Sequence, residues 1–522
     1  MDRLSCIWML TLALLLGGCG NMPARKPMPV SQALMPADVA TTRLANVAAA
    51  SGLAEARGLS GFRLLSTGEY AFDARSALAD AAERSIDAQY YHVHDDSAGV
   101  AFLRSLRDAA RRGVRVRLLV DDYHAGEAFN LLIALNAEPG AEVRLFNPLL
   151  RRSGSPMARL LWSWQDFDRA HRRMHNKLFV VDNTVAIFGG RNVANEYFWR
   201  NGEANFIDLD VMAVGPVVPL LSLSFDAYWN SELAWGADLV PGAGRSADYE
   251  SRLFDRRSAD LPLSMTVAPT DPLGQTSVRD QLRQGALQLR WGVATVHADP
   301  PTKITDPVVL YQPTPAMRAK LDVIGQAREE VIIVNPYFIP DEPGMQMMAE
   351  AKRNNVRGII FTNSLGSTDE PLVHRAYSRF RRDMLRLGMQ LYEMKPVQPA
   401  GGGDFGDFGT SIGRLHVKGA AVDRRWLLVG SVNLDGRSAV LNTELAVNID
   451  SPLLVSDALT ALGREPWRTM YQVTLAEDDE TLQWRDTDAE GRIQIFAEEP
   501  GDSAAWRAWH YFQSLFIDES ML

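Results

Sequence analysis

The chain has 522 residues, of which 46% are hydrophobic, and its formal net charge is −10. A chain of this length and composition can bury a large core, and its acidic balance argues against a general affinity for nucleic acid, which requires a basic face. The only two cysteines, Cys6 and Cys19, lie in the first 19 residues. The rest of the chain therefore contains no disulfide and no thiolate metal site.

The first 19 residues have the pattern of an export signal. Arg3 precedes the apolar run 7–16, which is too short for a stable transmembrane helix, and small residues before Cys19 fit a processing site. The segment resembles a bacterial lipoprotein signal, in which Cys19 becomes the lipidated first residue; a plain secretory signal is the alternative. Gly20 then predicts a lipid-anchored protein of the bacterial cell envelope, on the periplasmic side of the outer membrane. Residues 20–58, rich in Ala, Pro and Met, indicate a tether.

The body of the chain is repeated. Three segments of the first part have later counterparts: 84–96 with 330–341, 113–122 with 355–364, and 143–148 with 390–396. The separations are nearly constant, at 246 residues from Tyr91 to Tyr337 and 242 from Arg115 to Arg357. Such offsets indicate one ancestral unit used twice.

Within each unit, β-rich runs alternate with helical patterns. This order predicts an α/β fold in which each half is a mixed sheet flanked by helices. We place the halves at 59–308 and 309–475, with 476–522 as a C-terminal extension that packs on the body. Related halves most naturally pack about a pseudo-two-fold axis, with one shared active site.

Both halves contain the same short motif, a His-x-Lys followed by an Asp and a Gly-rich turn that ends in Asn. The copies share their spacing to the residue and comprise His175, Lys177, Asp182 and Asn192 in the first half and His416, Lys418, Asp423 and Asn433 in the second. Two imidazoles and two ammonium groups suit nucleophilic displacement at a phosphate diester. The lysines and asparagines would hold the non-bridging phosphate oxygens.

Each imidazole also needs a carboxylate on its far nitrogen. Asp208 and Glu444 fit by position, 33 and 28 residues after the His of their own half. Asp182 and Asp423 sit where a strand turns, and we expect them to fix that turn. A metal is not expected because an ammonium group would repel a cation, and His92, His94, His124 and His171, which have no repeated partner, are interpreted as structural or peripheral.

The doubled motif closely resembles the signature of the phospholipase D superfamily, H-x-K-x4-D-x6-G-[GS]-x-N. The resemblance implies catalysis without metal or cofactor through a covalent phosphatidyl-histidine, with His175 as nucleophile and His416 as general acid, although the nearly symmetric sequence also allows the reverse order. The segments around Ser364 and Arg437 look like those of bacterial cardiolipin synthases, and the lack of two N-terminal transmembrane helices makes the chain resemble the class C type.

This resemblance implies a phosphatidyltransferase that forms cardiolipin at a membrane surface. Its substrates would be phospholipids, namely phosphatidylglycerol and, as a further candidate, phosphatidylethanolamine, and not nucleic acid. Two alternatives stay open: a phospholipase D hydrolase that releases phosphatidic acid, and a metal-independent phosphodiesterase or nuclease of the same superfamily. The sequence identifies no accessory protein.

A basic and aromatic stretch, 149–173, directly precedes the first motif and includes Trp162 and Trp164 among several arginines. Such a stretch either engages anionic headgroups at the mouth of the site or forms an ordinary amphipathic helix packed on the domain.

Overall fold

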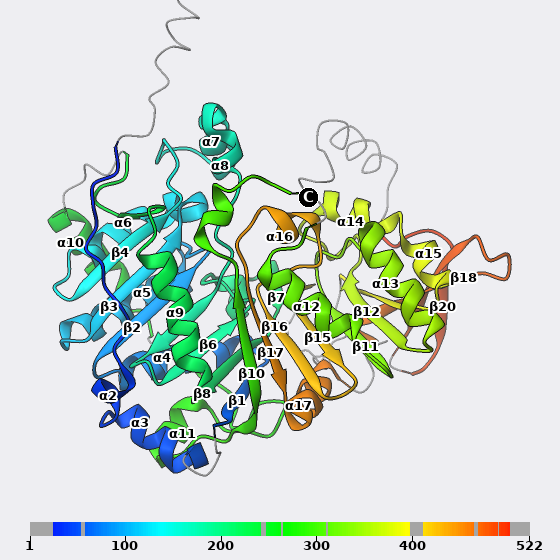
Figure 1. Cartoon of the computed structure of the whole chain (residues 1–522), viewed down its shortest axis with the longest axis horizontal. Coiled ribbons are helices and arrows are strands. Elements are labelled where there is room, and N and C mark those ends of the chain that lie inside the picture. Colours follow the sequence, from blue (N-terminus) through cyan, green and yellow to red (C-terminus); the bar gives the residue numbers. More distant parts are fainter. Residues whose placement is uncertain are drawn as a thin grey trace, which may run out of the picture.

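The computed structural model describes residues 24–53, 58–241, 247–262, 265–309, 312–396, 411–463, 468–488 and 490–501. The predicted signal with Cys19 and the end of the predicted C-terminal extension, 502–522, lie outside these residues. Figure 1 shows two α/β units side by side, with helices covering a twisted sheet that runs through both of them.

The first unit contains eight strands of this sheet among the described residues. They are β1 (Ser60–Leu65), β2 (Ser85–Tyr90), β3 (Arg115–Asp121), β4 (Ala141–Phe146), β5 (Leu178–Val181), β6 (Val185–Gly189), β8 (Asp210–Val214) and β9 (Ala234–Gly236). Its larger helices are α4 (Gly68–Ala81), α5 (Ser97–Arg111), α6 (Asp122–Asn136), α9 (Val217–Trp229) and α10 (Ala247–Ser258). Shorter helices are α2 (Pro36–Val39), α3 (Arg43–Ala48), α7 (Pro156–Leu161), α8 (Phe167–Ala170) and α11 (Val278–Gln284).

The second unit repeats this arrangement. Its strands are β10 (Arg290–Ala298), β11 (Glu330–Val334), β12 (Arg357–Asn363), β13 (Gln390–Met394), β15 (Gly419–Val422), β16 (Trp426–Gly430), β17 (Leu445–Asp450), β18 (Met470–Leu475), β19 (Leu482–Thr487) and β20 (Ile493–Phe496). Its helices are α12 (Pro315–Gly325), α13 (Asp341–Arg353), α14 (Pro371–Ser378), α15 (Arg381–Arg386), α16 (Gly436–Val440) and α17 (Pro452–Leu462).

The strand order shows the internal symmetry. Hydrogen-bonded neighbours run β9-β4-β3-β2-β5-β6-β8-β1 in the first unit and β18-β13-β12-β11-β15-β16-β17-β10 in the second. The two series meet where β1 pairs antiparallel with β10, so that 18 strands form one continuous sheet. The predicted mixed α/β fold of two homologous halves is confirmed. The sequence placed β10 in the first half, but β10 occupies the position in the second unit that β1 occupies in the first.

Both faces of the sheet are buried, which explains the nearly continuous apolar runs in its strands. Alternate residues of β5 divide between two cores: Phe179 packs with α4, α5 and α6, whereas Leu178 and Val180 join a core that includes α9, α17 and strands of both units. A third core lies under α12 and α13. The shared middle core holds the two units in one orientation.

Two further features bear on function. The start of the predicted C-terminal extension forms β19 and β20, which continue the second unit's sheet beyond β18. Among the described residues, no helix combines the length and apolarity needed to cross a membrane.

Candidate active site

Each catalytic His candidate directly follows a residue whose backbone pairs with the other unit. β14 (Ile412–Leu415) runs parallel to β7 (Ala204–Ile207) with Leu415 beside Ile207, and the next residue, His416, donates its backbone N–H to the Ile207 carbonyl at 2.7 Å. The symmetric contact is a bridge between Met174 and Thr443, where the His175 N–H donates to the Thr443 carbonyl at 2.9 Å. These two pairings bring both motifs into one site.

These backbone pairings between the units also determine which carboxylate lies beside which imidazole. Parallel register places Asp208, the residue after β7, beside His416, and its Oδ2 lies 2.6 Å from His416 Nδ1. Glu444, the residue after Thr443, lies 3.0 Å from His175 Nδ1 through Oε2. The sequence spacing pairs each acid with the His of its own half, and that pairing is wrong because each imidazole is oriented by a carboxylate of the other unit.

The lysines of the two motifs have matching surroundings. Lys177 Nζ donates to the carbonyl of His175 and Lys418 Nζ to that of His416, both at 2.7 Å. Each ammonium group also faces a tyrosine ring, with Nζ 5.5 Å from the centroid of Tyr91 and 5.4 Å from that of Tyr337. The two histidines and the two lysines of the motifs are all buried, so they interact mainly through protein rather than through bulk water.

Tyr91 and Tyr337, which the sequence repeat pairs, do not occupy equivalent backbone positions in the two units. The bridges of Val93 with Val193 and of Phe338 with Leu434 set the offset in this segment at 245 residues. Tyr337 therefore occupies the backbone position of His92, while its ring packs edge-on against His416 at 6.2 Å, as Tyr91 does against His175 at 5.3 Å.

The Gly-rich turns of the two units differ at two positions, Gly190 against Ser431 and Arg191 against Val432, and the first difference affects the carboxylates. A Cβ at Gly190 would lie 2.2 Å from Asp208 Oδ1, so glycine is required for the carboxylate to reach His416. In the second unit this position is Ser431, whose hydroxyl donates to Glu444 Oε2, and Ser438 Oγ lies 2.8 Å from Oε1 of the same carboxylate. Sequence reasoning missed these two serines, although Ser431 was visible as the departure from Gly-Gly in the motif.

The turns also position the asparagines. Asn192 Nδ2 donates to the Tyr197 hydroxyl at 2.9 Å, and the His92 backbone N–H donates to Asn192 Oδ1. Asn433 Oδ1 is buried without a hydrogen-bond partner among the described residues. A buried amide atom of this kind is normally satisfied by a ligand or water.

The two motif aspartates serve the scaffold. Asp182 accepts hydrogen bonds from the backbone N–H groups of residues 83–85, and Asp423 does so from those of residues 328–330. Both aspartates have φ of 50° and stand in the hairpin turn after the motif strand. Each therefore ties that turn to the start of β2 or β11, as the sequence suggested.

Burial dominates the electrostatics of the cationic groups. It lowers the pKa of His175 to about 4 and that of Lys418 to about 8, and it holds the pKa of Lys177 and of His416 well below their ordinary values. The positive charges of Lys418, Lys177 and His175 lower the pKa of His416 further, which shows that the two motifs share one electrostatic environment. The imidazoles are thus mainly neutral at pH 7, and the negative charge of an entering phosphodiester would favour protonation of one of them.

The two carboxylates are not equivalent. Burial raises the pKa of Asp208. Burial also acts to raise the pKa of Glu444, but His175, Lys177 and the Ser431 hydroxyl outweigh it and lower that pKa. Glu444 therefore remains an anion behind His175.

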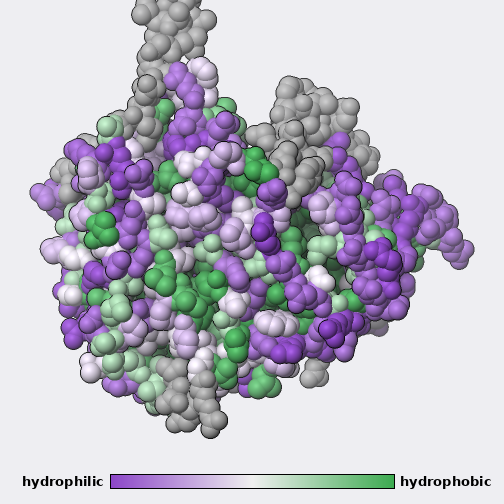
Figure 2. Space-filling view, viewed as in Figure 1, coloured by the Kyte–Doolittle hydropathy of each residue, from purple (hydrophilic) through white to green (hydrophobic). Residues whose placement is uncertain are grey.

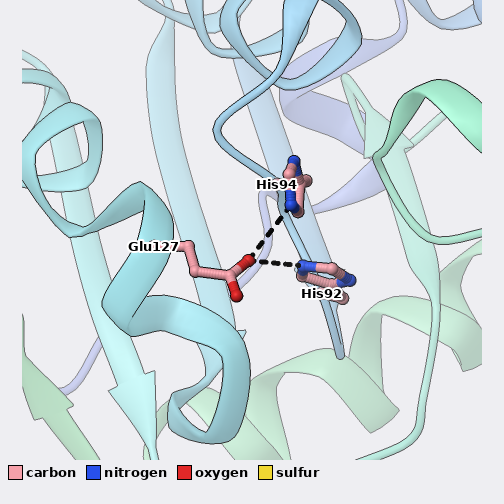
Figure 3. Close-up of side chains that lie close together, drawn as sticks. All are labelled: His92, His94 and Glu127. Carbon is pink, nitrogen blue, oxygen red and sulfur yellow. Dashed lines mark ion pairs between the residues drawn. The ribbon is translucent and has the colours of Figure 1, made fainter. Parts of the chain in front are cut away.

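A separate polar cluster lies beside Tyr91 (Figure 3). His92 and His94, just after β2, and Glu127 of α6 place one ligand atom each within 4.8 Å of the others. His94 Nε2 lies 3.2 Å from Glu127 Oε2 and its Nδ1 3.3 Å from Asp96, and these contacts raise the pKa of His94. The His92 ring stacks on His124 at 4.4 Å, and burial lowers the pKa of His124 to about 3. The cluster has ligand types that could hold a divalent metal, but its polar atoms are also engaged in ion pairs, consistent with the peripheral role expected for these histidines.

The site contains two imidazoles on a duplicated mixed sheet, and each imidazole has a carboxylate at its Nδ1 and a lysine of the same motif nearby. This combination defines a phospholipase D-type site. The chain matches the family model described as "Cardiolipin synthase, PLD-like domain" twice, over residues 76–229 and 321–464. The protein belongs to this family.

Known proteins are similar over most of the chain. Cardiolipin synthase C of Escherichia coli is 34% identical over 440 residues, which cover 83% of this chain and 90% of that protein. Cardiolipin synthase 2 of Staphylococcus epidermidis is 24% identical over 365 residues, covering 70% of this chain and 59% of that protein. The crystal structure of phosphatidylserine synthase from Haemophilus influenzae shares the fold, with a TM-score of 0.53 and 13% identity over 80% of this chain and 91% of that one.

Proposed function

We propose that the protein is a phosphatidyltransferase that moves a phosphatidyl group from one phospholipid to the hydroxyl of another and so forms cardiolipin. The observation that carries this proposal is the pair of oriented imidazoles in one buried site, each held by a carboxylate of the opposite unit. The similarity to cardiolipin synthases along both units supports the substrate class. Phosphatidylglycerol is the proposed acceptor, and phosphatidylglycerol or phosphatidylethanolamine the donor.

The reaction proceeds in two displacements. Nε2 of His175 attacks phosphorus and forms a P–N bond, while the P–O bond to the donor's alcohol breaks and that oxygen takes a proton from His416. In the second step His416 removes the proton of the acceptor hydroxyl, whose oxygen attacks phosphorus and displaces His175. The ionised Glu444 favours His175 as nucleophile because it stabilises the positive imidazole ring of the intermediate.

The remaining groups stabilise charge. Lys177, Lys418 and the amides of Asn192 and Asn433 would hold the non-bridging oxygens of the phosphate. Burial of all these side chains limits access of water to the covalent intermediate, which favours transfer over hydrolysis.

We further propose that the protein works at a membrane surface of the bacterial envelope, held by lipid on Cys19. α7 and the residues after it support a surface contact, since Met157, Leu161, Trp162 and Trp164 are 47–63% exposed. The Arg151 guanidinium lies 3.5 Å from the centre of the Trp162 ring, which combines a cation with an aromatic side chain suited to the lipid headgroup region.

The test supplies the purified protein with vesicles of phosphatidylglycerol, with and without phosphatidylethanolamine, in EDTA, and identifies products by mass spectrometry. Wild type should form cardiolipin, and His175→Ala and His416→Ala should each lower the rate by about 10³-fold or more. His297→Gln, on β10, is the matched control and should retain activity.

Each other outcome has a definite meaning. Phosphatidic acid as the main product would identify the hydrolase instead. Wild-type levels of cardiolipin from either alanine variant would contradict the proposed chemistry.

A further inference from the structure

The second unit contains an apolar cavity of about 520 Å³ between α12, α13 and the sheet. Its walls are mostly aliphatic, aromatic and methionine side chains, including Met317, Leu321, Met347, Phe380, Met389 and Leu434. Figure 2 shows hydrophobic residues between more hydrophilic ones over this part of the molecule. Pockets of this size and lining are typical of sites for small apolar ligands.

At the equivalent place in the described part of the first unit, three phenylalanines fill the space under the helices. Phe72 of α4, Phe102 of α5 and Phe198 are at most 3% exposed, and the rings of Phe72 and Phe198 pack edge-on at 5.1 Å. The phenylalanines belong to the core under the helices of that unit.

The repeat identifies their counterparts. Asp182 binds the backbone of residue 83 as Asp423 binds that of residue 328, so equivalent residues before β2 and β11 are 245 positions apart. Applied to α4 and α12, this offset makes Met317 the counterpart of Phe72. The Gly99 N–H donates to Asp96 as the Gly344 N–H does to Asp341, which continues the offset of 245 into the starts of α5 and α13, so Phe102 corresponds to Met347.

The third counterpart follows from the motif. Asn192 and Asn433 are 241 residues apart, so Phe198 corresponds to Ala439. Met317, Met347 and Ala439 all line the cavity. The cavity therefore results from replacement of three buried rings by smaller or more flexible side chains on an otherwise repeated scaffold.

The cavity adjoins the active site. Two of its wall residues, Phe338 and Leu434, pair with each other and directly follow Tyr337 and Asn433. A phosphate bound by the motif lysines would therefore lie close along the backbone to two residues of the cavity wall. The methionines suit an occupant of variable shape, because their side chains adapt to irregular surfaces.

We propose that this cavity holds one acyl chain of the phospholipid substrate during phosphatidyl transfer. The inference rests on the proposed function, because it requires a diacyl substrate at the motif histidines. It assigns the two units different tasks: both supply catalytic groups, but the second also binds the lipid's apolar part.

The test restores the missing bulk. Ala439→Phe, which copies Phe198, should lower turnover of dihexadecanoyl phosphatidylglycerol about tenfold or more and leave turnover of the dibutyryl lipid within about twofold. Met347→Trp fills the cavity from α13 and gives a second, independent variant. Leu223→Phe, which adds a ring at an exposed position of α9 outside the cavity, is the matched control and should keep the wild-type preference.

A binding measurement separates this inference from the function. The fluorescent fatty acid cis-parinaric acid should bind wild type and the inactive His175→Ala variant alike, and Ala439→Phe should weaken its binding about tenfold or more. If neither lipid reacts but this binding pattern holds, the proposed function fails and the acyl site stands. If both filling variants bind the probe and select chain length as wild type does, the cavity is not an acyl site.

Discussion

At the scale of single residues, the crossed pairs His175–Glu444 and His416–Asp208 determine how the imidazoles act. Asp208→Asn should keep the His416 ring in place but lose the charge that stabilises its protonated form. We expect turnover to fall by about 10²–10⁴-fold with a smaller change in the Michaelis constant. Steady-state kinetics with a water-soluble phosphodiester lipid measures both quantities.

Asp423→Asn is the matched control for this prediction, because Asp423 binds the backbone N–H groups of residues 328–330. It should lower the thermal unfolding midpoint and leave the turnover of folded protein within a few-fold of wild type. Unchanged turnover in Asp208→Asn would mean that His416 does not depend on this carboxylate.

The identity of these residues was predictable from the sequence, but their pairing was not. Identical spacing in two copies singled out both motifs, and Asp208 and Glu444 followed from position. Which acid reaches which imidazole depends on the register of β7 with β14 and on the bridge of Met174 with Thr443. These contacts join segments more than 200 residues apart, and spacing within one half carries no information about them.

At the scale of elements, α7 and the residues after it provide a test of membrane contact. Trp162→Ser combined with Trp164→Ser removes two exposed rings, which should weaken binding to phosphatidylglycerol vesicles about tenfold or more. Arg159, buried in α7, binds Asp122, so the helix should remain in place. Vesicle sedimentation measures the partition.

Leu223→Ser is the control for the tryptophan variant, because Leu223 is 66% exposed but lies on α9 rather than near α7. Its vesicle binding should equal that of wild type. Equal loss in both variants would show that binding reflects general surface hydrophobicity rather than α7.

The elements themselves were largely predictable because the hydrophobic pattern occurs twice with nearly constant offsets. The exception is β10, whose residues lack a recognisable repeat of β1. β10 joins the second unit because it pairs with β1 on one side and with β17 on the other. These tertiary contacts, rather than the local sequence pattern, determine its place in the sheet.

At the scale of the whole molecule, burial of the imidazoles should make stability depend on pH. The pKa of His175 is about 4 in the folded protein and about 6.5 in an unfolded chain, so only the unfolded state takes up a proton between these values. Stability should therefore fall as pH decreases from about 6.5 to 4, by about 3 kcal/mol from His175 alone. His416 contributes in the same direction, since its pKa is also lowered.

His175→Gln combined with His416→Gln should remove this contribution, so the variant's thermal unfolding midpoint should fall less than that of wild type between pH 7 and pH 4.5. His94→Gln is a control of opposite sign, because Asp96 raises the pKa of His94 and its stabilisation is present at low pH. That variant should lose stability mainly in acid. If the unfolding midpoint of the double variant fell more steeply than that of wild type, the two imidazoles would be protonated in the folded protein. Their protonation would then not require the negative charge of a bound phosphodiester.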